Sequence, residues 1–158
     1  MLNRLFGKKE QELPPEERWT VAQGEDDGLP LIFRIRNKKP HGIELNTYPH
    51  LIAISWLYPS TNEFRMPSAE TSTLMMQFEE LLETVLEKSQ SAFLTVIVTG
   101  NERREWQWYS RSPEETMGFV NQVLMDREPF PVEFSMQKDP QWEAYQHFQG
   151  MCKDGRLG

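Results

Sequence analysis

Cysteine is nearly absent from the sequence, which has Cys152 as its one thiol. A single cysteine forms no intramolecular disulfide, and this is typical of proteins from a reducing compartment. A lone thiol acts as a nucleophile only when a base and an orienting group are held beside it. Cys152 lies in a polar stretch that we expect to be frayed, so a catalytic thiol is disfavoured. The lack of disulfides indicates a cytoplasmic location.

Long hydrophobic runs are also missing, because no stretch of about 18 apolar residues occurs. The sequence therefore predicts no membrane span. Residues 1–10 mix apolar with charged side chains and lack the apolar core and cleavage site of a signal peptide. They could touch a membrane as a short amphipathic turn, but so short a segment buries little surface. A flexible leader over residues 1–18 is favoured.

No sequence motif of a cofactor-binding or catalytic site is present. Both glycine-rich phosphate-binding patterns are absent, and so is the G-x-S-x-G pattern of a nucleophilic serine. Carboxylates are plentiful, but most are expected in first turns of helices or on outer helix faces, where they have structural roles. The sequence therefore assigns no catalytic residue and no cofactor, and an enzymatic role is disfavoured.

Metal-binding patterns are missing as well. His41, His50 and His147 lack the spacing of a zinc motif, and no third ligand lies near any pair of them in sequence. The acidic stretch 25–28 (EDDG) has neither the ligand spacing of a calcium loop nor its closing glutamate. A solvated hairpin loop is the favoured interpretation of that stretch, and no metal site is predicted.

Positive charge is in short supply, since the formal net charge is −7. A field of this sign repels phosphates and anionic lipid headgroups, so nucleic-acid binding is disfavoured. The nearest approach to a basic patch is Arg103, Arg104 and Arg111. A solvated turn and strand end is the favoured interpretation of these three residues.

The hydrophobic pattern predicts alternating strands and amphipathic helices. Strands are expected over 19–23, 31–36, 51–58, 93–99, 105–111 and 132–137. Helices are expected over 68–88 and 112–126, and a short last helix should begin at Asp139-Pro140. Ser68 is the expected N-cap of the first helix, and Ser112 with Glu115 forms a predicted capping box at the second.

The first of these helices has one clear apolar stripe. Its members fall at i, i+4, i+7, i+8 and i+11 and are Leu74, Phe78, Leu81, Leu82 and Val85. The glutamates off this stripe should face water, and they are Glu79, Glu80, Glu83 and Glu87.

From residue 51 the order of elements is strand, helix, strand, strand, helix, strand. This predicts an α+β fold with a ferredoxin-like split βαβ (βαββαβ) antiparallel sheet and helices on one face. An N-terminal β-hairpin precedes it and a short C-terminal helix follows. We expect one domain over 19–150, with the hairpin and a loop at 19–50, the core at 51–150, and a disordered tail at 151–158.

The strand at 93–99 is apolar on both faces, although the predicted topology places it at a sheet margin. It lacks the lysine or proline with which natural edge strands prevent aggregation. The hairpin at 19–36 is favoured as its cover over a second copy of the chain, so the protein is expected to be a monomer or an edge-paired homodimer. The strands at 51–58 and 105–111 are expected inside the sheet.

Tryptophan is the richest feature of the composition. Its five occurrences are Trp19, Trp56, Trp106, Trp108 and Trp142. Such residues form either a sticky binding surface or the core of a small sheet protein. The core is favoured for any one of them, because large aromatic side chains are buried on average.

Several short motifs give the chain a family resemblance over residues 59–148. They are Met66-Pro67, WYSRSPEE at 108–115, PFPVE at 129–133 and DPQWEAY at 139–145. The chain resembles the widespread bacterial family catalogued as domain of unknown function 695, and its layout and charge are similar to the family of the regulator of ribonuclease E activity B. The first resemblance implies a ferredoxin-like sheet and no particular activity. The family-motif residues, each with a structural interpretation, are Trp108, Tyr109, Asp139, Pro140, Trp142 and Tyr145.

The sequence leaves two hypotheses for function. The first is a non-enzymatic protein-interaction or regulatory module of a bacterial cytoplasm, with a protein partner that the sequence does not identify. The alternative is a small-ligand-binding protein or enzyme with a pocket between the N-terminal hairpin and the sheet. A concave pocket with converging polar groups favours the alternative, and a flat surface with exposed tryptophan or tyrosine favours the first.

Overall fold

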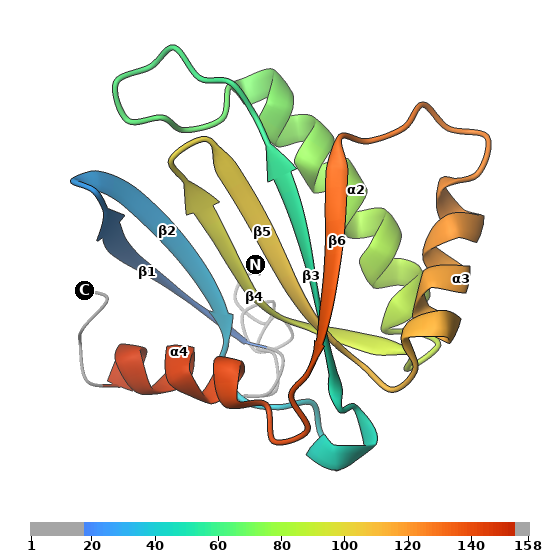
Figure 1. Cartoon of the computed structure of the whole chain (residues 1–158). Coiled ribbons are helices and arrows are strands. Elements are labelled where there is room, and N and C mark those ends of the chain that lie inside the picture. The colour runs from blue at the N-terminus through green and yellow to red at the C-terminus, as the bar shows by residue number, and fades with distance from the viewer. Residues whose placement is uncertain (1–17, 154–158) are drawn as a thin grey trace, which may run out of the picture.

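The computed structural model describes residues 18–153, which fold around one antiparallel sheet (Figure 1). Its strands are β1 (Trp19–Asp26), β2 (Leu29–Arg36), β3 (His50–Leu57), β4 (Ala92–Gly100), β5 (Arg103–Ser110) and β6 (Val132–Lys138), in the spatial order β1-β2-β4-β5-β3-β6. The expected leader, apart from Arg18, and residues 154–158 of the expected tail lie outside the described residues. The predicted mixed α+β class is confirmed.

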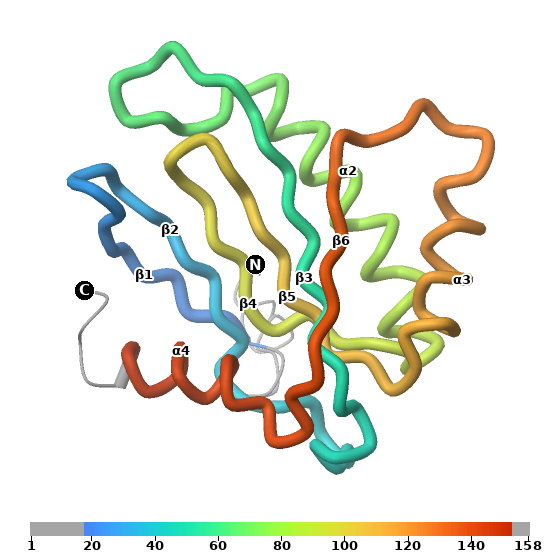
Figure 2. The backbone as a smooth tube through the Cα atoms, viewed as in Figure 1, coloured from blue at the N-terminus to red at the C-terminus, as the bar shows by residue number. Residues whose placement is uncertain are grey.

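Two tight turns have backbone angles that suit hairpins. Asp27 and Gly28 connect β1 to β2 with φ of 52° and 79°, and Asn101 and Glu102 connect β4 to β5 with φ of 51° and 68°. Positive φ at both central positions is the geometry of a type I′ turn, which matches the twist of the paired strands. Figure 2 shows the two turns at the same end of the sheet.

The N-terminal hairpin covers the edge of β4. Antiparallel pairing of β2 with β4 extends from Ile32 opposite Thr99 to Ile35 opposite Val96. The prediction that the hairpin supplies this cover is confirmed, and β3 and β5 lie inside the sheet as expected. The close approach depends on Gly100, where an added Cβ would lie 2.5 Å from the carbonyl oxygen of Pro30.

Helices α2 (Ala69–Leu86) and α3 (Pro113–Leu124) pack together on one face of the sheet (Figure 1). Both begin at the expected caps, because the Ser68 hydroxyl accepts from the Thr71 amide and the Ser112 hydroxyl accepts from the Glu115 amide. The reciprocal half of the predicted capping box is not formed. The Ser112 amide donates to the Ser110 hydroxyl instead, and the Glu115 carboxylate binds Arg111.

The rotation of α2 differs from the prediction. Leu74 is 43% exposed, whereas Met75 and Leu86 are buried with Phe78 and Leu82. The helix is therefore turned so that part of its acidic side faces the sheet and hairpin.

Three of the glutamates expected to face water are consequently half-buried. Glu79 binds Arg34 at 2.7 Å, and Glu87 binds Arg36 at 2.9 Å. Glu83 lies between them on the helix, and burial raises its pKa from 4.5 to about 7. Glu80 is the one of the four that is exposed as expected.

The opposite face of the sheet holds a second, smaller core. Helix α4 (Glu143–Lys153) packs over one end of this face, and the other end is not covered by a helix (Figure 1). The sheet contributes Phe33, Ile35 and Tyr109 to this core, and α4 contributes Tyr145. Because α4 continues to Lys153, it includes Cys152, which is half-buried in the last turn of the helix.

Candidate functional site

A cavity of about 490 Å³ lies on the open part of the face that α4 partly covers. We call it the α4-side cavity. It is lined by the two hairpin turns, the adjoining strands and one residue of α4: Asp26, Leu31, Phe33, Leu57, Val98, Gly100, Asn101, Arg103, Glu105, Gln107 and Phe148. The cavity therefore draws on segments that span most of the described chain.

Strand alternation explains why β5 gives this cavity its polar side. Successive residues of a strand point to opposite faces of the sheet. Trp106 and Trp108 are buried in the core beneath α2 and α3, so Arg103, Glu105 and Gln107 point to the other face. The two tryptophans share the face that packs beneath the helices.

The hairpin and α4 supply the apolar side of the cavity. Leu31 and Phe33 from β2 lie beside Val98 of β4, which is the register partner of Phe33. Phe148 of α4 closes this side, with its ring centroid 5.7 Å from that of Phe33. A ligand in the cavity would therefore contact hydrocarbon on one side and charged or amide groups on the other.

The polar groups of β5 are already connected to one another. Arg103 donates to the Glu105 carboxylate and to the Ser55 hydroxyl, and the Gln107 amide nitrogen donates to Glu105 at 2.8 Å. This fixes the orientation of the Gln107 side chain and leaves its carbonyl oxygen as the free end. That oxygen is buried and has no hydrogen-bond partner among the described residues.

A buried side-chain carbonyl oxygen without a hydrogen-bond partner is unusual, since most buried polar atoms in native proteins have one. Gln107 is only 9% exposed, so bulk water does not reach its carbonyl oxygen freely. Gln107 is one of the residues that line the α4-side cavity.

One further contact joins the two turns at the rim. The Asn101 amide donates to the Asp26 carboxylate at 2.9 Å. Because Asp26 ends β1 and Asn101 begins the β4–β5 turn, this contact holds the hairpin against the rest of the sheet.

Four of the family-motif residues, Tyr109, Asp139, Trp142 and Tyr145, make contacts between the sheet and the start of α4. The Tyr109 hydroxyl donates to Asp139 at 2.6 Å, and the same carboxylate accepts from the amides of Glu143 and Ala144 at the start of α4. The ring of Tyr109 stacks on Trp142 at 4.3 Å. These contacts fix the helix that carries Phe148.

Two details of this anchor differ from the prediction. The helix begins at Glu143, so Pro140 lies in the turn before it and does not start it. Trp142 takes a positive φ of 57° in that turn, which swings its indole nitrogen toward the carbonyl of Tyr48 at 2.9 Å. Trp108 lies on the other face, in the core beneath α2 and α3.

Burial sets the ionisation of the anchoring tyrosines. The pKa of Tyr109 is raised above its ordinary value by burial and by its hydrogen bond to Asp139. Burial likewise raises the pKa of Tyr145, whose hydroxyl donates to the Arg36 carbonyl at 2.6 Å. Both phenols are thus neutral donors at physiological pH, which suits an anchoring role.

The remaining candidates from the sequence are dispersed. Within residues 18–153 no three His, Cys, Asp or Glu side chains are grouped so that they could hold a metal ion. The arginines at 103 and 104 point to opposite faces of the sheet, and Arg111 is bound to Glu115, so these residues do not form one basic patch. Burial raises the pKa of Cys152, which disfavours its reactive thiolate.

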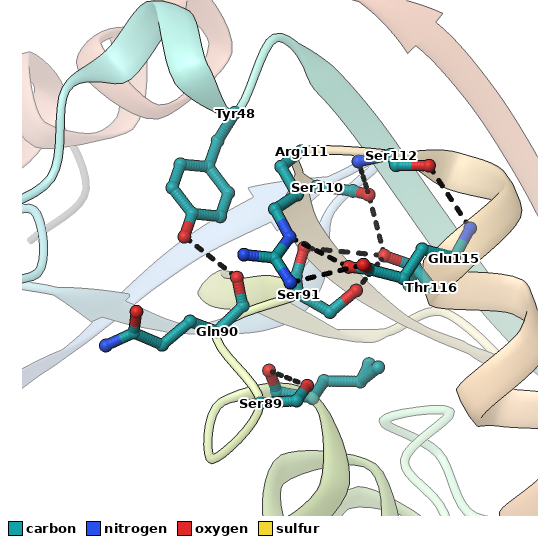
Figure 3. A network of polar contacts seen from close by, with 10 residues as sticks. Tyr48, Ser89, Gln90, Ser91, Ser110, Arg111, Ser112, Glu115 and Thr116 are labelled. Carbon is teal, nitrogen blue, oxygen red and sulfur yellow. Dashed lines mark hydrogen bonds and ion pairs between the residues drawn. The ribbon is translucent and has the colours of Figure 1, made fainter.

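A polar network marks the start of α3 (Figure 3). The Thr116 hydroxyl lies 2.8 Å from that of Ser91 and 2.7 Å from that of Ser110, and all three residues are buried. Beside them, Arg111 makes two hydrogen bonds to Glu115. Because each of the three hydroxyls has a partner within the protein, this network explains how the start of α3 is fixed to β5 and to the residue before β4.

A family model described as "Family of unknown function (DUF695)" matches residues 17–149. The chain belongs to this family. The match spans the hairpin, the sheet and most of α4, so the α4-side cavity lies entirely within it. No match is found among curated proteins or among solved structures.

None of the helices in the described part of the chain is long and apolar enough to cross a membrane.

Sequence reasoning did not single out Glu105 and Gln107 as residues of the α4-side cavity. The signal that could have found them was the polar set that alternates with Trp106 and Trp108 on one strand.

Proposed function

We propose that the protein binds a small organic molecule in the α4-side cavity. The observation that carries this proposal is a cavity of about 490 Å³ whose lining includes Gln107, and the buried side-chain carbonyl oxygen of Gln107 has no hydrogen-bond partner among the described residues. This volume lies within the range of about 300–1,000 Å³ that is usual for small-molecule sites. Its lining combines β2 of the hairpin with β4 and β5, and this supports the alternative hypothesis from the sequence, although the hairpin is itself part of the sheet.

The lining favours a ligand with an apolar body and a hydrogen-bond donor, such as an amine. The donor would face Glu105 and the Gln107 carbonyl, and the apolar body would contact Phe33 and Phe148. Two carboxylates, Asp26 and Glu105, face one guanidinium, that of Arg103. The cavity therefore has an excess of negative charge, which attracts cations more than anions.

The aromatic residues give less support to a protein-binding surface. Trp19 is half-buried, the other four tryptophans are buried, and so are all four tyrosines. Their rings pack on one another in the two cores, for example Trp56 on Phe78. An unidentified protein partner and a cytoplasmic location stay predictions from the sequence.

We also infer that residues 50–138 have the split βαβ topology of ferredoxin-like folds. The spatial order β4-β5-β3-β6 and the common face of α2 and α3 support this. The motif residues Tyr109, Asp139, Trp142 and Tyr145 are proposed to act structurally, as the anchor of α4.

The test uses benzylamine, which combines an apolar ring with an ammonium group. It is added to the ¹⁵N-labelled full-length protein, and backbone amide shifts are followed by NMR. We expect saturable shifts at Leu31, Val98 and Gln107. The variant Q107L removes the acceptor at similar volume and should weaken binding about tenfold.

The matched control is Q137L, a glutamine exchanged at an exposed position of β6 on the same sheet. It should bind benzylamine like the wild type. Shifts spread evenly over the surface, or equal affinity in Q107L and wild type, would refute ligand binding through Gln107.

A further inference from the structure

A second cavity, of about 320 Å³, lies on the opposite face of the sheet. It is enclosed by the hairpin, strands β4 and β5, and the beginning of α2, and we call it the α2-side cavity. Its polar lining consists of Arg34, Arg104, Ser72 and Thr99. The remainder of its wall is apolar and includes Ile32, Ile97 and Met66.

Two guanidinium groups converge on this cavity. Arg34 projects from β2 and Arg104 from β5, and the β4 residues between them, Ile97 and Thr99, form the wall. Burial and, after it, the positive charge of Arg34 lower the pKa of Arg104, while the charge of Glu79 acts in the opposite direction. The protein therefore holds two like charges in a partly desolvated place, where their repulsion is weakly screened.

The cavity lacks enough negative charge to neutralise both arginines. Arg34 is bound by Glu79 at 2.7 Å, and Glu79 also accepts from the indole nitrogen of Trp106. Arg104 donates its Nε to the Thr99 hydroxyl at 2.7 Å and lies over the Trp106 ring. No carboxylate within residues 18–153 forms an ion pair with Arg104.

The Arg104 side chain is held in place by contacts to neutral groups. The Thr99 hydroxyl fixes its Nε and the indole supports its plane, so the terminal nitrogens have a set direction. A planar guanidinium with a fixed orientation binds an oxyanion through two parallel hydrogen bonds.

The first turn of α2 also borders the cavity, and it carries the acidic Glu70. Ser72 lies in that turn and lines the cavity together with Pro67, which precedes the helix. The amino end of a helix carries a partial positive charge and favours anions nearby. The contribution is secondary to that of the two arginines.

We propose that the α2-side cavity binds a small organic oxyanion, with Arg104 as its principal ligand and Arg34 and Ser72 as supporting ones. The oxyanion is a carboxylate or a phosphate ester on an apolar body, because hydrocarbon lines the rest of the cavity. This site is independent of the α4-side cavity, which has an excess of negative charge on the other face of the sheet.

The test titrates the ¹⁵N-labelled full-length protein with sodium benzoate and, separately, with inorganic phosphate, while sodium chloride keeps the ionic strength constant. We expect saturable shifts at the Ser72 and Thr99 amides and at the Arg104 Nε–H. Tighter benzoate binding identifies a carboxylate with an apolar body, and tighter phosphate binding identifies a phosphate ester. Either result supports the oxyanion site.

Two variants make the assignment specific. R104Q should weaken binding of the preferred anion about tenfold, since it removes a charge-assisted hydrogen bond. S72E places a carboxylate at the cavity in the first helical turn, a position that tolerates acidic residues, and should also block the anion. The matched control is R111Q, which removes an exposed arginine that already binds Glu115 outside the cavity and should leave binding unchanged.

The proposal is overturned if sodium chloride alone reproduces the shifts, or if R104Q and S72E both bind benzoate and phosphate like the wild type. Benzylamine binding to R104Q reports on the other cavity. Loss of benzoate binding with benzylamine binding intact therefore separates the two sites.

Discussion

Glu83 offers a direct measurement of how α2 faces the hairpin. Burial is the main cause that raises its pKa from 4.5 to about 7, and the neighbouring charges of Glu79 and Glu87 add to it. Arg34 and Arg36 act in the opposite direction but do not cancel the effect. We predict that replacing Glu83 by glutamine stabilises the protein at neutral and alkaline pH.

The sign follows from proton binding. The folded state holds the Glu83 proton up to about pH 7, whereas the unfolded state loses it near pH 4.5. Stability from this group is therefore fully present below pH 4.5 and is lost as the pH rises to about 7. A shift of this size is equivalent to at most about 3.4 kcal/mol, and partial exposure reduces the effect to roughly 1–3 kcal/mol.

Urea unfolding of wild type and E83Q between pH 4 and pH 8 provides the measurement. The two free energies of unfolding should agree near pH 4, and E83Q should become more stable by roughly 1–3 kcal/mol near pH 8. The control is E80Q on the exposed side of the same helix, which should follow the wild type. Parallel curves for wild type and E83Q, or an equal gain in E80Q, would refute the placement of Glu83 against the hairpin.

Further predictions concern the hairpin and the anchor of α4. G100A should lower the free energy of unfolding by about 1–3 kcal/mol in urea titrations, because the added Cβ meets the backbone of Pro30 at 2.5 Å and the φ of 152° is unfavourable for alanine. The control is G118A, which should be neutral or stabilising, because its added Cβ would meet nothing within 4 Å apart from its chain neighbours and the backbone of its own helix. Y109F should cost about 1–3 kcal/mol, because a buried carboxylate oxygen of Asp139 loses its phenolic donor, and an unchanged unfolding midpoint would contradict the anchor. Deletion of residues 1–37 should give a protein that aggregates or fails to fold, since the edge of β4 becomes unpaired; a soluble, cooperatively folded monomer in sedimentation and thermal melts would contradict that role of the hairpin.

Local sequence patterns were sufficient to predict the strands, the turns and most of the order of strands in the sheet. Strand 93–99 is apolar on both faces and lacks the devices of an exposed edge, and from this alone the hairpin could be placed beside it. The D-G turn and the serine caps are likewise short-range signals whose physics is contained within a few residues.

The orientation of α2 could not be obtained in this way. The partner that draws Glu79 inward is Arg34, 45 residues away in sequence, and no local pattern records that pairing. Leu74 and Met75 are adjacent in sequence and both are apolar. The hydrophobic pattern alone is therefore compatible with a helix that buries Leu74 and with one that buries Met75. The start of α4 was missed for a similar reason, because Trp142 leaves helical geometry to reach Tyr48.

The residues that line the proposed site could not be predicted from the sequence. A pocket between hairpin and sheet was an expectation from the sequence, whereas its lining depends on register. Leu57 faces Arg103 and Ser55 faces Glu105 only because β3 and β5 pair in this alignment, and a slip of one residue would turn every side chain to the other face.

Helix α4 also has a consequence for how the protein opens. Its Tyr145 hydroxyl and its Gln149 amide donate to the carbonyls of Arg36 and Asn37, at the end of the hairpin, while Trp142 binds Tyr48 ahead of the central strand β3. The helix thus ties the hairpin to the rest of the sheet from outside, and β2 cannot separate from β4 without breaking these contacts. The hairpin and α4 should therefore form one cooperative unfolding unit, and their slowest amide protons should exchange with the same opening free energy.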